Sequence, residues 1–153
     1  MTENDIEHYK NRLRKDFYSF RNGAVVESLK NSGTPYPYVF GLLLPQLTEV
    51  ARNYPKDIDL ARALWEEKDC REFRLLSLYL LPLEILNKDD VSIFINDIRT
   101  FEEAELLPFK VLRNLSFAHE ILNDLKNSSS ELAIQSPIYS HFLKMFEKNL
   151  SAR

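Results

Sequence analysis

The stretch from Leu60 to Leu86 most constrains the fold, because it holds two helical patterns separated by a short charged break. The second pattern, from Phe73 to Leu81, is apolar on almost every side and predicts a helix that its neighbours bury. A buried helix paired with an amphipathic one is the repeating unit of an α-solenoid. The first pattern supplies the amphipathic partner, with apolar residues at the spacing of one helix face: Leu60, Ala61, Leu64 and Trp65.

Charged residues at the joint predict where the buried helix begins. Asp69 and Glu72 have the spacing of a capping box, which places the start of the helix at Cys70. Pro82 is expected to kink or end it. Cys70 is also a candidate nucleophile, but a structural role is favoured, because burial in an apolar repeat would offset activation of the thiol by the helix N-terminus.

Recurring helical patterns cover the rest of the chain, and no strand is predicted. The helices number about eight or nine and pair at intervals of roughly 35–45 residues, the length of a HEAT-type unit. Pro108 is expected to kink or break one helix after Leu107, and the serine-rich residues 127–130 are expected to form a polar linker. The predicted fold class is all-α, a right-handed α-solenoid of HEAT-like antiparallel helix pairs, in a single domain over residues 1–153.

Bulk composition favours a cytoplasmic protein with no membrane partner. The 153 residues include one cysteine, so no disulfide forms within the chain, which favours a reducing compartment. The N-terminal residues are polar and mixed in charge, unlike a signal peptide. The longest apolar run is too short for a bilayer, which needs about 20 residues. A formal net charge of −3 disfavours an indiscriminate nucleic-acid binder but leaves room for a local basic face.

The sequence lacks the motifs of several common enzyme classes. It holds no Walker loop, dinucleotide-binding fingerprint, zinc-protease motif or nucleophile elbow. His8, His119 and His141 are scattered and, with a single cysteine, form no convincing ligand set. No metal and no cofactor is therefore predicted.

An acidic cluster follows Thr100, which is expected to cap a helix whose first residue is Phe101. Glu102 and Glu103 are explained by capping and by the helix dipole, which favours carboxylates in the first turn. Glu105 lies beyond that turn and is less easily explained by capping. It is therefore the acidic residue to weigh as a functional group.

Five short segments between about Val39 and Leu112 follow one another in a set order: Phe40-Gly41, Pro45-Gln46-Leu47, Leu64-Trp65, Arg71-Glu72-Phe73 and Ile95 to Phe101. Together they resemble the HEAT-like DNA alkylation repair (AlkD-type) glycosylase family. In that family the last segment carries a tryptophan that packs on the nucleoside sugar. Four residues on, an aspartate stabilises positive charge on the sugar as the alkylated base leaves. The resemblance therefore implies that Phe101 binds substrate and that Glu105 is the catalytic carboxylate.

The chain departs from the family at both positions. Phenylalanine keeps an aromatic face without the indole, and glutamate moves the charge by roughly 1 Å, which can cost about 10²-fold in rate. Active members also continue for several more helices, with a second aromatic residue and basic residues that bind phosphate. The resemblance thus implies a divergent binding module with weak or lost base excision. The alternative is an active alkylpurine DNA glycosylase or damage binder that uses Phe101 and Glu105.

The segment before Gly23 is locally basic. Its cations form either a solvated helix face or a patch that contacts DNA phosphates. The DNA interpretation gains if they line the same concave face as Phe101 and Glu105. Double-stranded DNA, a protein partner and a second copy of the chain are the candidate partners. The candidate DNA-backbone residues are Arg12, Arg14, Lys15 and Arg21.

Overall fold

The computed structural model describes residues 1–132 and 136–152, and of 129–132 only the backbone. Over these residues the chain is all-helical, with nine α-helices, two short 3-10 helices and no strand. The first five helices are α1 (Glu3–Ser19), α2 (Gly23–Asn31), α3 (Leu44–Ala51), α4 (Ile58–Trp65) and α5 (Arg71–Tyr79). They are followed by η1 (Leu83–Ile85), α6 (Lys88–Ile95), α7 (Phe101–Lys110), η2 (Leu112–Asn114), α8 (Ala118–Leu132) and α9 (Pro137–Ser151).

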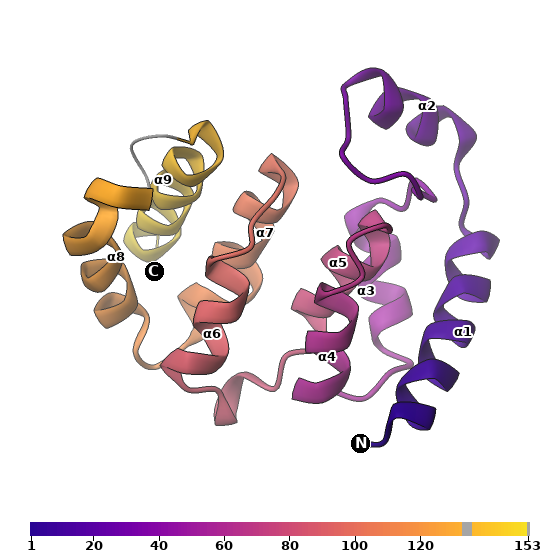
Figure 1. Cartoon of the computed structure of the whole chain (residues 1–153), viewed down its shortest axis with the longest axis horizontal. Coiled ribbons are helices and arrows are strands. Elements are labelled where there is room, and N and C mark those ends of the chain that lie inside the picture. The colour runs from indigo at the N-terminus through magenta and orange to yellow at the C-terminus, as the bar shows by residue number, and fades with distance from the viewer. Residues whose placement is uncertain (133–135, 153) are drawn as a thin grey trace. The chain divides into compact units, whose positions relative to one another are not determined.

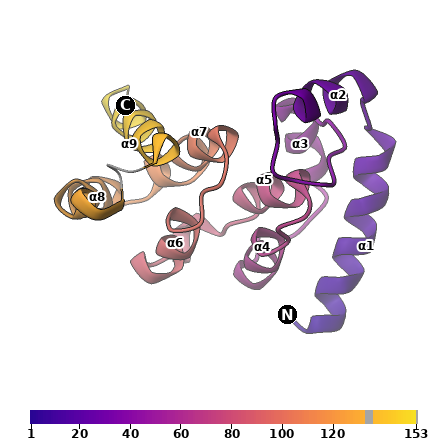
Figure 2. The ribbon, with the colours of Figure 1, turned by 45° about the horizontal axis from the view of Figure 1, so that its top comes forward.

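The chain folds into two compact units, Met1–Pro82 and Leu83–Arg153. The N-terminal unit contains α1 to α5, and the C-terminal unit contains α6 to α9 (Figures 1 and 2). The single HEAT-like domain expected over 1–153 stays a prediction.

Helix α5 is the centre of the N-terminal unit. Every residue from Arg71 to Leu78 is buried, which confirms the burial predicted from the apolar pattern that begins at Phe73. Helices α3 and α4 pack against it. From α1, the buried Phe17 ring lies 5.6 Å from Phe73 of α5 and 5.7 Å from Phe40, measured between ring centroids. The inner face of α1 is therefore fixed against α5 and against the loop that holds Phe40.

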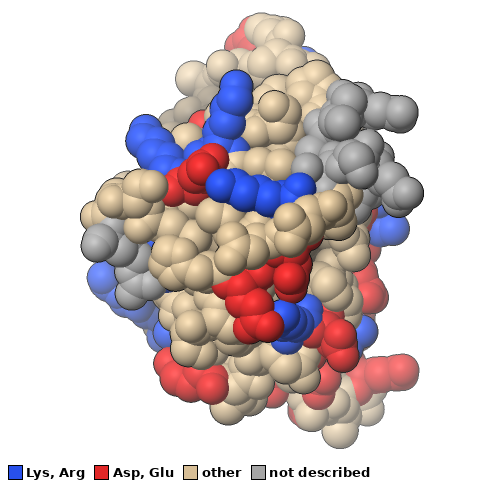
Figure 3. Space-filling model, turned by 90° about the vertical axis from the view of Figure 1, so that its left-hand side faces the viewer, with Lys and Arg blue, Asp and Glu red and all other residues tan. Residues whose placement is uncertain are grey.

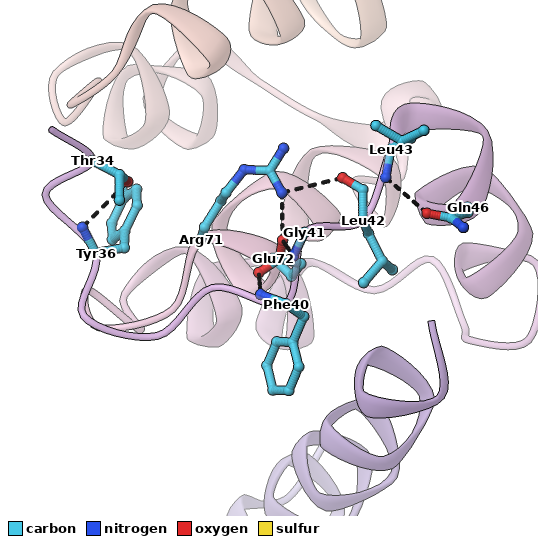
Figure 4. Close-up of polar contacts among 9 residues, drawn as sticks. All are labelled: Thr34, Tyr36, Phe40, Gly41, Leu42, Leu43, Gln46, Arg71 and Glu72. Atoms are coloured by element: carbon cyan, nitrogen blue, oxygen red, sulfur yellow. Dashed lines mark hydrogen bonds and ion pairs between the residues drawn. The ribbon is translucent and has the colours of Figure 1, made fainter. Parts of the chain in front are cut away.

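Two charged residues at the start of α5 hold the loop between α2 and α3. The Glu72 carboxylate, fully buried, accepts hydrogen bonds from the backbone N–H groups of Phe40 at 2.9 Å and Gly41 at 3.1 Å. Arg71 Nη1 donates to the Leu42 carbonyl oxygen at 3.1 Å and also to the Glu72 carboxylate (Figure 4). The loop backbone thus finds in α5 the partners that buried N–H and C=O groups require.

A third buried charge, Arg74, secures the next part of the loop. Its Nη1 donates to the Trp65 carbonyl oxygen at 2.5 Å, and its Nε donates to the Tyr36 hydroxyl at 3.2 Å. The Arg74 guanidinium also lies 3.6 Å from the centroid of the Trp65 ring. Tyr36 is buried as a result, and it packs with Val39 against Val26 of α2.

The C-terminal unit is built mainly around the packing of α9 on α7. Phe142 and Phe146 of α9 are fully buried, as are Ala104 and Leu107 of α7. Tyr139 adds a polar tie, because its hydroxyl donates to the Ile95 carbonyl oxygen at 2.9 Å. Helix α8 packs on α9 in turn.

The capping box expected at Asp69 and Glu72 is wrong. Cys70 is the N-cap of α5 and makes no side-chain cap bond. The Arg71 N–H donates instead to the Tyr38 carbonyl oxygen at 3.1 Å, within a parallel bridge between Tyr38 and Cys70. A carbonyl group of the loop therefore accepts the hydrogen bond from the first N–H group of α5, and the Glu72 carboxylate accepts hydrogen bonds from the loop.

The linker expected at residues 127–130 is wrong, and of the kink or break expected at Pro108 the break is wrong. Residues 127–130 are not a linker, because α8 continues to Leu132. The Ser128 hydroxyl donates to the Asp124 carbonyl oxygen at 2.9 Å, so this serine bonds within its own helix. Helix α7 does not break after Leu107, because it continues through Pro108 to Lys110.

Gly33 and Gly41 form a matched pair of test positions. Both have φ of +83°, but a Cβ on Gly41 would lie 2.7 Å from the Asn22 carbonyl oxygen, whereas one on Gly33 would meet nothing within 4 Å. Gly33→Ala should cost about 1–2 kcal/mol of unfolding free energy from backbone strain. Gly41→Ala should cost about 1–3 kcal/mol more from the clash. Urea denaturation followed by circular dichroism measures both, and equal costs would contradict the close approach at Gly41.

Candidate functional site

The start of α7 positions both residues that the family resemblance selected. Thr100 is the N-cap, and its hydroxyl accepts a hydrogen bond from the Glu103 N–H at 3.2 Å. The buried Glu103 carboxylate accepts from the Arg99 N–H at 3.0 Å, which fixes the chain just before the helix. Phe101 is then the first helical residue, as predicted, and Glu105 lies one turn later on the same helix face.

His141 of α9 completes a cluster with these two side chains, which we call the α7–α9 cluster. Its Nε2 lies 3.1 Å from Glu105 Oε1. Its ring meets Phe101 edge to face, with centroids 5.1 Å apart and an angle of 80° between the planes. Phe101 is 52% exposed, so part of its ring faces water.

Solvent exposure limits what the α7–α9 cluster can do chemically. The Glu105 side chain is 59% exposed and that of His141 is 30% exposed. A carboxylate stabilises developing positive charge most strongly where water is excluded. The ring of Phe101 and the two polar groups beside it are better suited to hold a flat or cationic group than to drive bond cleavage.

The packing of α9 explains why His141 reaches this position. Phe142 and Phe146 anchor one face of α9, and their rings stack with centroids 6.1 Å apart. Tyr139 lies on the adjoining side, and burial, with a smaller contribution from the Asp97 charge, raises the pKa of its hydroxyl. His141 precedes Phe142, so it projects beside the anchored face toward α7.

The four candidate DNA-backbone residues belong to the N-terminal unit. Arg12, Arg14, Lys15 and Arg21 are all exposed. Phe101 and Glu105 belong to the C-terminal unit. The expectation that both sets line one concave face therefore stays a prediction.

Sequence reasoning missed His141 as a member of the cluster. The residue lies 36 positions after Glu105, and neither spacing nor motif links the two. It also missed the buried polar role of Arg71, Glu72 and Arg74. Their only sequence signal was three charges inside an otherwise apolar helix, which indicates buried partners.

Cys70 is buried, as expected for a structural thiol. Burial raises the pKa of the Cys70 thiol to about 11, and the nearby Glu72 and Glu67 charges act in the same direction. The thiolate that a nucleophile needs is therefore scarce near neutral pH. Cys70 contributes to packing at the start of α5.

Among the side chains that the structure describes, no three His, Cys, Asp or Glu residues gather as metal ligands do. None of the helices within residues 1–132 and 136–152 has the length and apolar character that crossing a bilayer requires. Comparisons of the chain with protein-family models, with curated proteins and with solved structures found no match.

The exposed pair Glu105–His141 should contribute little to stability. In a double-mutant cycle, Glu105→Gln removes the carboxylate, and His141→Phe keeps a ring against Phe101 but removes Nε2. We expect a coupling energy below about 1 kcal/mol, the usual value for an exposed pair. Urea denaturation of the four proteins measures it. A coupling energy near 3 kcal/mol or more would show that the Glu105 carboxylate is shielded from water, which would contradict its exposure in the structure.

Proposed function

We propose that the chain is a HEAT-like helical-repeat binding module with weak or lost base-excision activity. Its helix pairs would form a right-handed α-solenoid, and it would be a divergent relative of the AlkD-type glycosylases. The buried helix α5 with its partner α4 supports the repeat architecture, as does the packing of α8 on α9. The single cysteine supports a cytoplasmic location.

The exposure of Glu105 is the observation that carries this proposal. A glycosylase of this kind needs its carboxylate against the sugar in a water-excluded pocket. The Glu105 side chain is 59% exposed, and its Oε1 lies 3.1 Å from His141 Nε2. Phe101 still presents an exposed aromatic surface. The α7–α9 cluster can therefore contact a ligand even where Glu105 no longer supports catalysis.

The distribution of surface charge supports a binding function in which electrostatic attraction to the ligand is limited. The side of the molecule on which α8 and α9 lie in Figure 1 shows acidic and basic side chains interspersed among uncharged ones (Figure 3). The chain as a whole carries a formal charge of −3. Double-stranded DNA, a protein partner and a second copy of the chain are the candidate ligands, and contact through Phe101 is common to all three.

An active alkylpurine glycosylase or damage binder is the alternative. It is favoured by one observation, that Phe101 and Glu105 lie one helical turn apart on the same face of α7. In that case Phe101 would pack on the sugar and Glu105 would stabilise the positive charge that develops on the sugar as the alkylated base leaves. The two hypotheses differ in whether removal of the Glu105 charge changes the rate of base release.

Base release from a duplex that contains alkylated purines separates them. We expect release no faster than without protein, and no change with Glu105→Gln. The same preparation should bind a duplex with an abasic-site mimic, and Phe101→Ala should weaken that binding on the order of fivefold through loss of the stacked ring. Gel-resolved strand cleavage and fluorescence anisotropy provide the two readouts.

Glu84→Gln is the matched control, because Glu84 is an exposed carboxylate of the same unit outside the cluster. Release above the background that Glu105→Gln abolishes and Glu84→Gln retains would overturn the proposal in favour of the glycosylase. Duplex binding that Phe101→Ala leaves unchanged would show that the α7–α9 cluster does not contact the ligand.

A further inference from the structure

Helix α1 has an outer face on which several cations lack acidic partners. Between His8 and Arg21 the sequence holds five basic residues and one acidic residue. Lys10 is buried and paired with Glu67 at 2.6 Å. The other four are exposed, and no carboxylate lies within ion-pair distance of them among the residues that the structure describes: Arg12, Arg14, Lys15 and Arg21. Their charge is available to an external anion.

Aromatic rings rather than carboxylates hold two of these cations. The Arg12 guanidinium carbon lies 4.9 Å from the centroid of the Tyr54 ring, and that of Arg14 lies 5.4 Å from the Phe73 ring. Arg14 also donates to the Asn11 side-chain oxygen at 2.8 Å. Cation–π contacts position a guanidinium without neutralising it. The charges are therefore partly ordered before any ligand binds.

Tyr18 lies within the same surface. It follows Arg14 by four residues and Lys15 by three, so all three share one helix face. Arg21 follows Tyr18 by three residues and lies just beyond the end of α1 at Ser19. The Tyr18 side chain is 72% exposed, while the opposite face of α1 carries the buried Leu13 and Phe17. An exposed aromatic ring among unneutralised cations combines the two features that single-stranded nucleic acid recognises, a backbone track and a stacking surface.

We propose that this basic–aromatic face, made of Arg14, Lys15, Tyr18 and Arg21, binds single-stranded nucleic acid. The cations contact phosphates, and one unpaired base stacks on the Tyr18 ring. A single strand is favoured over a duplex because the base faces of a duplex are already stacked on one another and cannot reach Tyr18. The proposal rests on α1 and does not use the α7–α9 cluster or the family resemblance.

The size of the face sets the expected strength and salt dependence. Three cations that neutralise about one phosphate each give a slope near −2 for log K against log salt, since single strands contribute about −0.7 per phosphate. Binding should therefore weaken by more than tenfold between about 50 and 200 mM salt. Replacing one cation should reduce the magnitude of the slope by about 0.7.

Fluorescence anisotropy with a labelled oligothymidylate of about 20 nucleotides, longer than most single-strand sites, tests this. We expect salt-sensitive binding that Tyr18→Ala weakens about fivefold or more and that Tyr18→Phe retains, because phenylalanine keeps the ring. Lys15→Ala should weaken binding and flatten the salt dependence. Lys68→Ala is the control, because Lys68 is another exposed lysine of the N-terminal unit. Circular dichroism confirms that each variant is folded.

Three results would overturn the proposal. The first is no binding at low salt. The second is binding that Tyr18→Ala and Lys15→Ala leave as it is in the wild-type protein. The third is a duplex of equal length bound at least as tightly as the single strand, which would leave no role for stacking on Tyr18. The assay uses undamaged DNA and α1 variants, so its failure is distinct from failure of the proposed function at Phe101.

Discussion

The N-terminal unit depends on one buried carboxylate, that of Glu72. It accepts hydrogen bonds from two loop N–H groups, and Arg71 beside it donates both to it and to the loop carbonyl of Leu42. The held loop in turn accepts at the Phe40 carbonyl oxygen a hydrogen bond from the Asn22 N–H at 2.9 Å. The Asn22 side chain caps α2, so the start of α2 is connected to α5 through the loop.

Because Glu72 and Arg71 are buried, loss of either charge destabilises the hydrogen bonds that hold the loop. A buried ion pair contributes little over an apolar pair, but removal of one partner leaves an uncompensated charge and costs about 3–5 kcal/mol. Glu72 and Arg71 are both buried, and their remaining hydrogen bonds are to backbone groups of Phe40, Gly41 and Leu42. The loop is therefore fixed in one conformation, and Phe40 is held against Phe17 on the inner face of α1. The outer face of α1 remains exposed.

Local signals predicted much of the helical framework. Thr100 was expected to cap a helix, and its hydroxyl accepts a hydrogen bond from the Glu103 N–H in the first turn. Asp69 failed as a cap because a loop 31 residues earlier in the chain competes for the Glu72 carboxylate. The serine-rich residues 127–130 failed as a linker signal because α8 continues through them, and the Ser128 hydroxyl bonds within its own helix. The case of Asp69 is decided by a contact between residues far apart in the sequence, which no local pattern shows.

The candidate site likewise combines features that local sequence patterns predict with features that depend on tertiary packing. The position of Phe101 and Glu105 on one face of α7 follows from the Thr100 cap and from helical spacing. The contact of both residues with His141 depends on the packing of α9, which the sequence does not specify locally. Exposure of Glu105 could not be predicted either, because a glutamate in the second turn of a helix is equally compatible with a pocket and with solvent.

Amide hydrogen exchange at Phe40 and Gly41, compared between the wild-type protein and Glu72→Gln, tests the central role of this carboxylate most directly. We predict that in the wild-type protein both amides exchange as slowly as those in the middle of α5, because they open only when the unit unfolds. Glu72→Gln should lose that protection, whereas Glu49→Gln, at an exposed carboxylate of α3, should retain it. Rapid exchange of both amides in the wild-type protein would contradict the account.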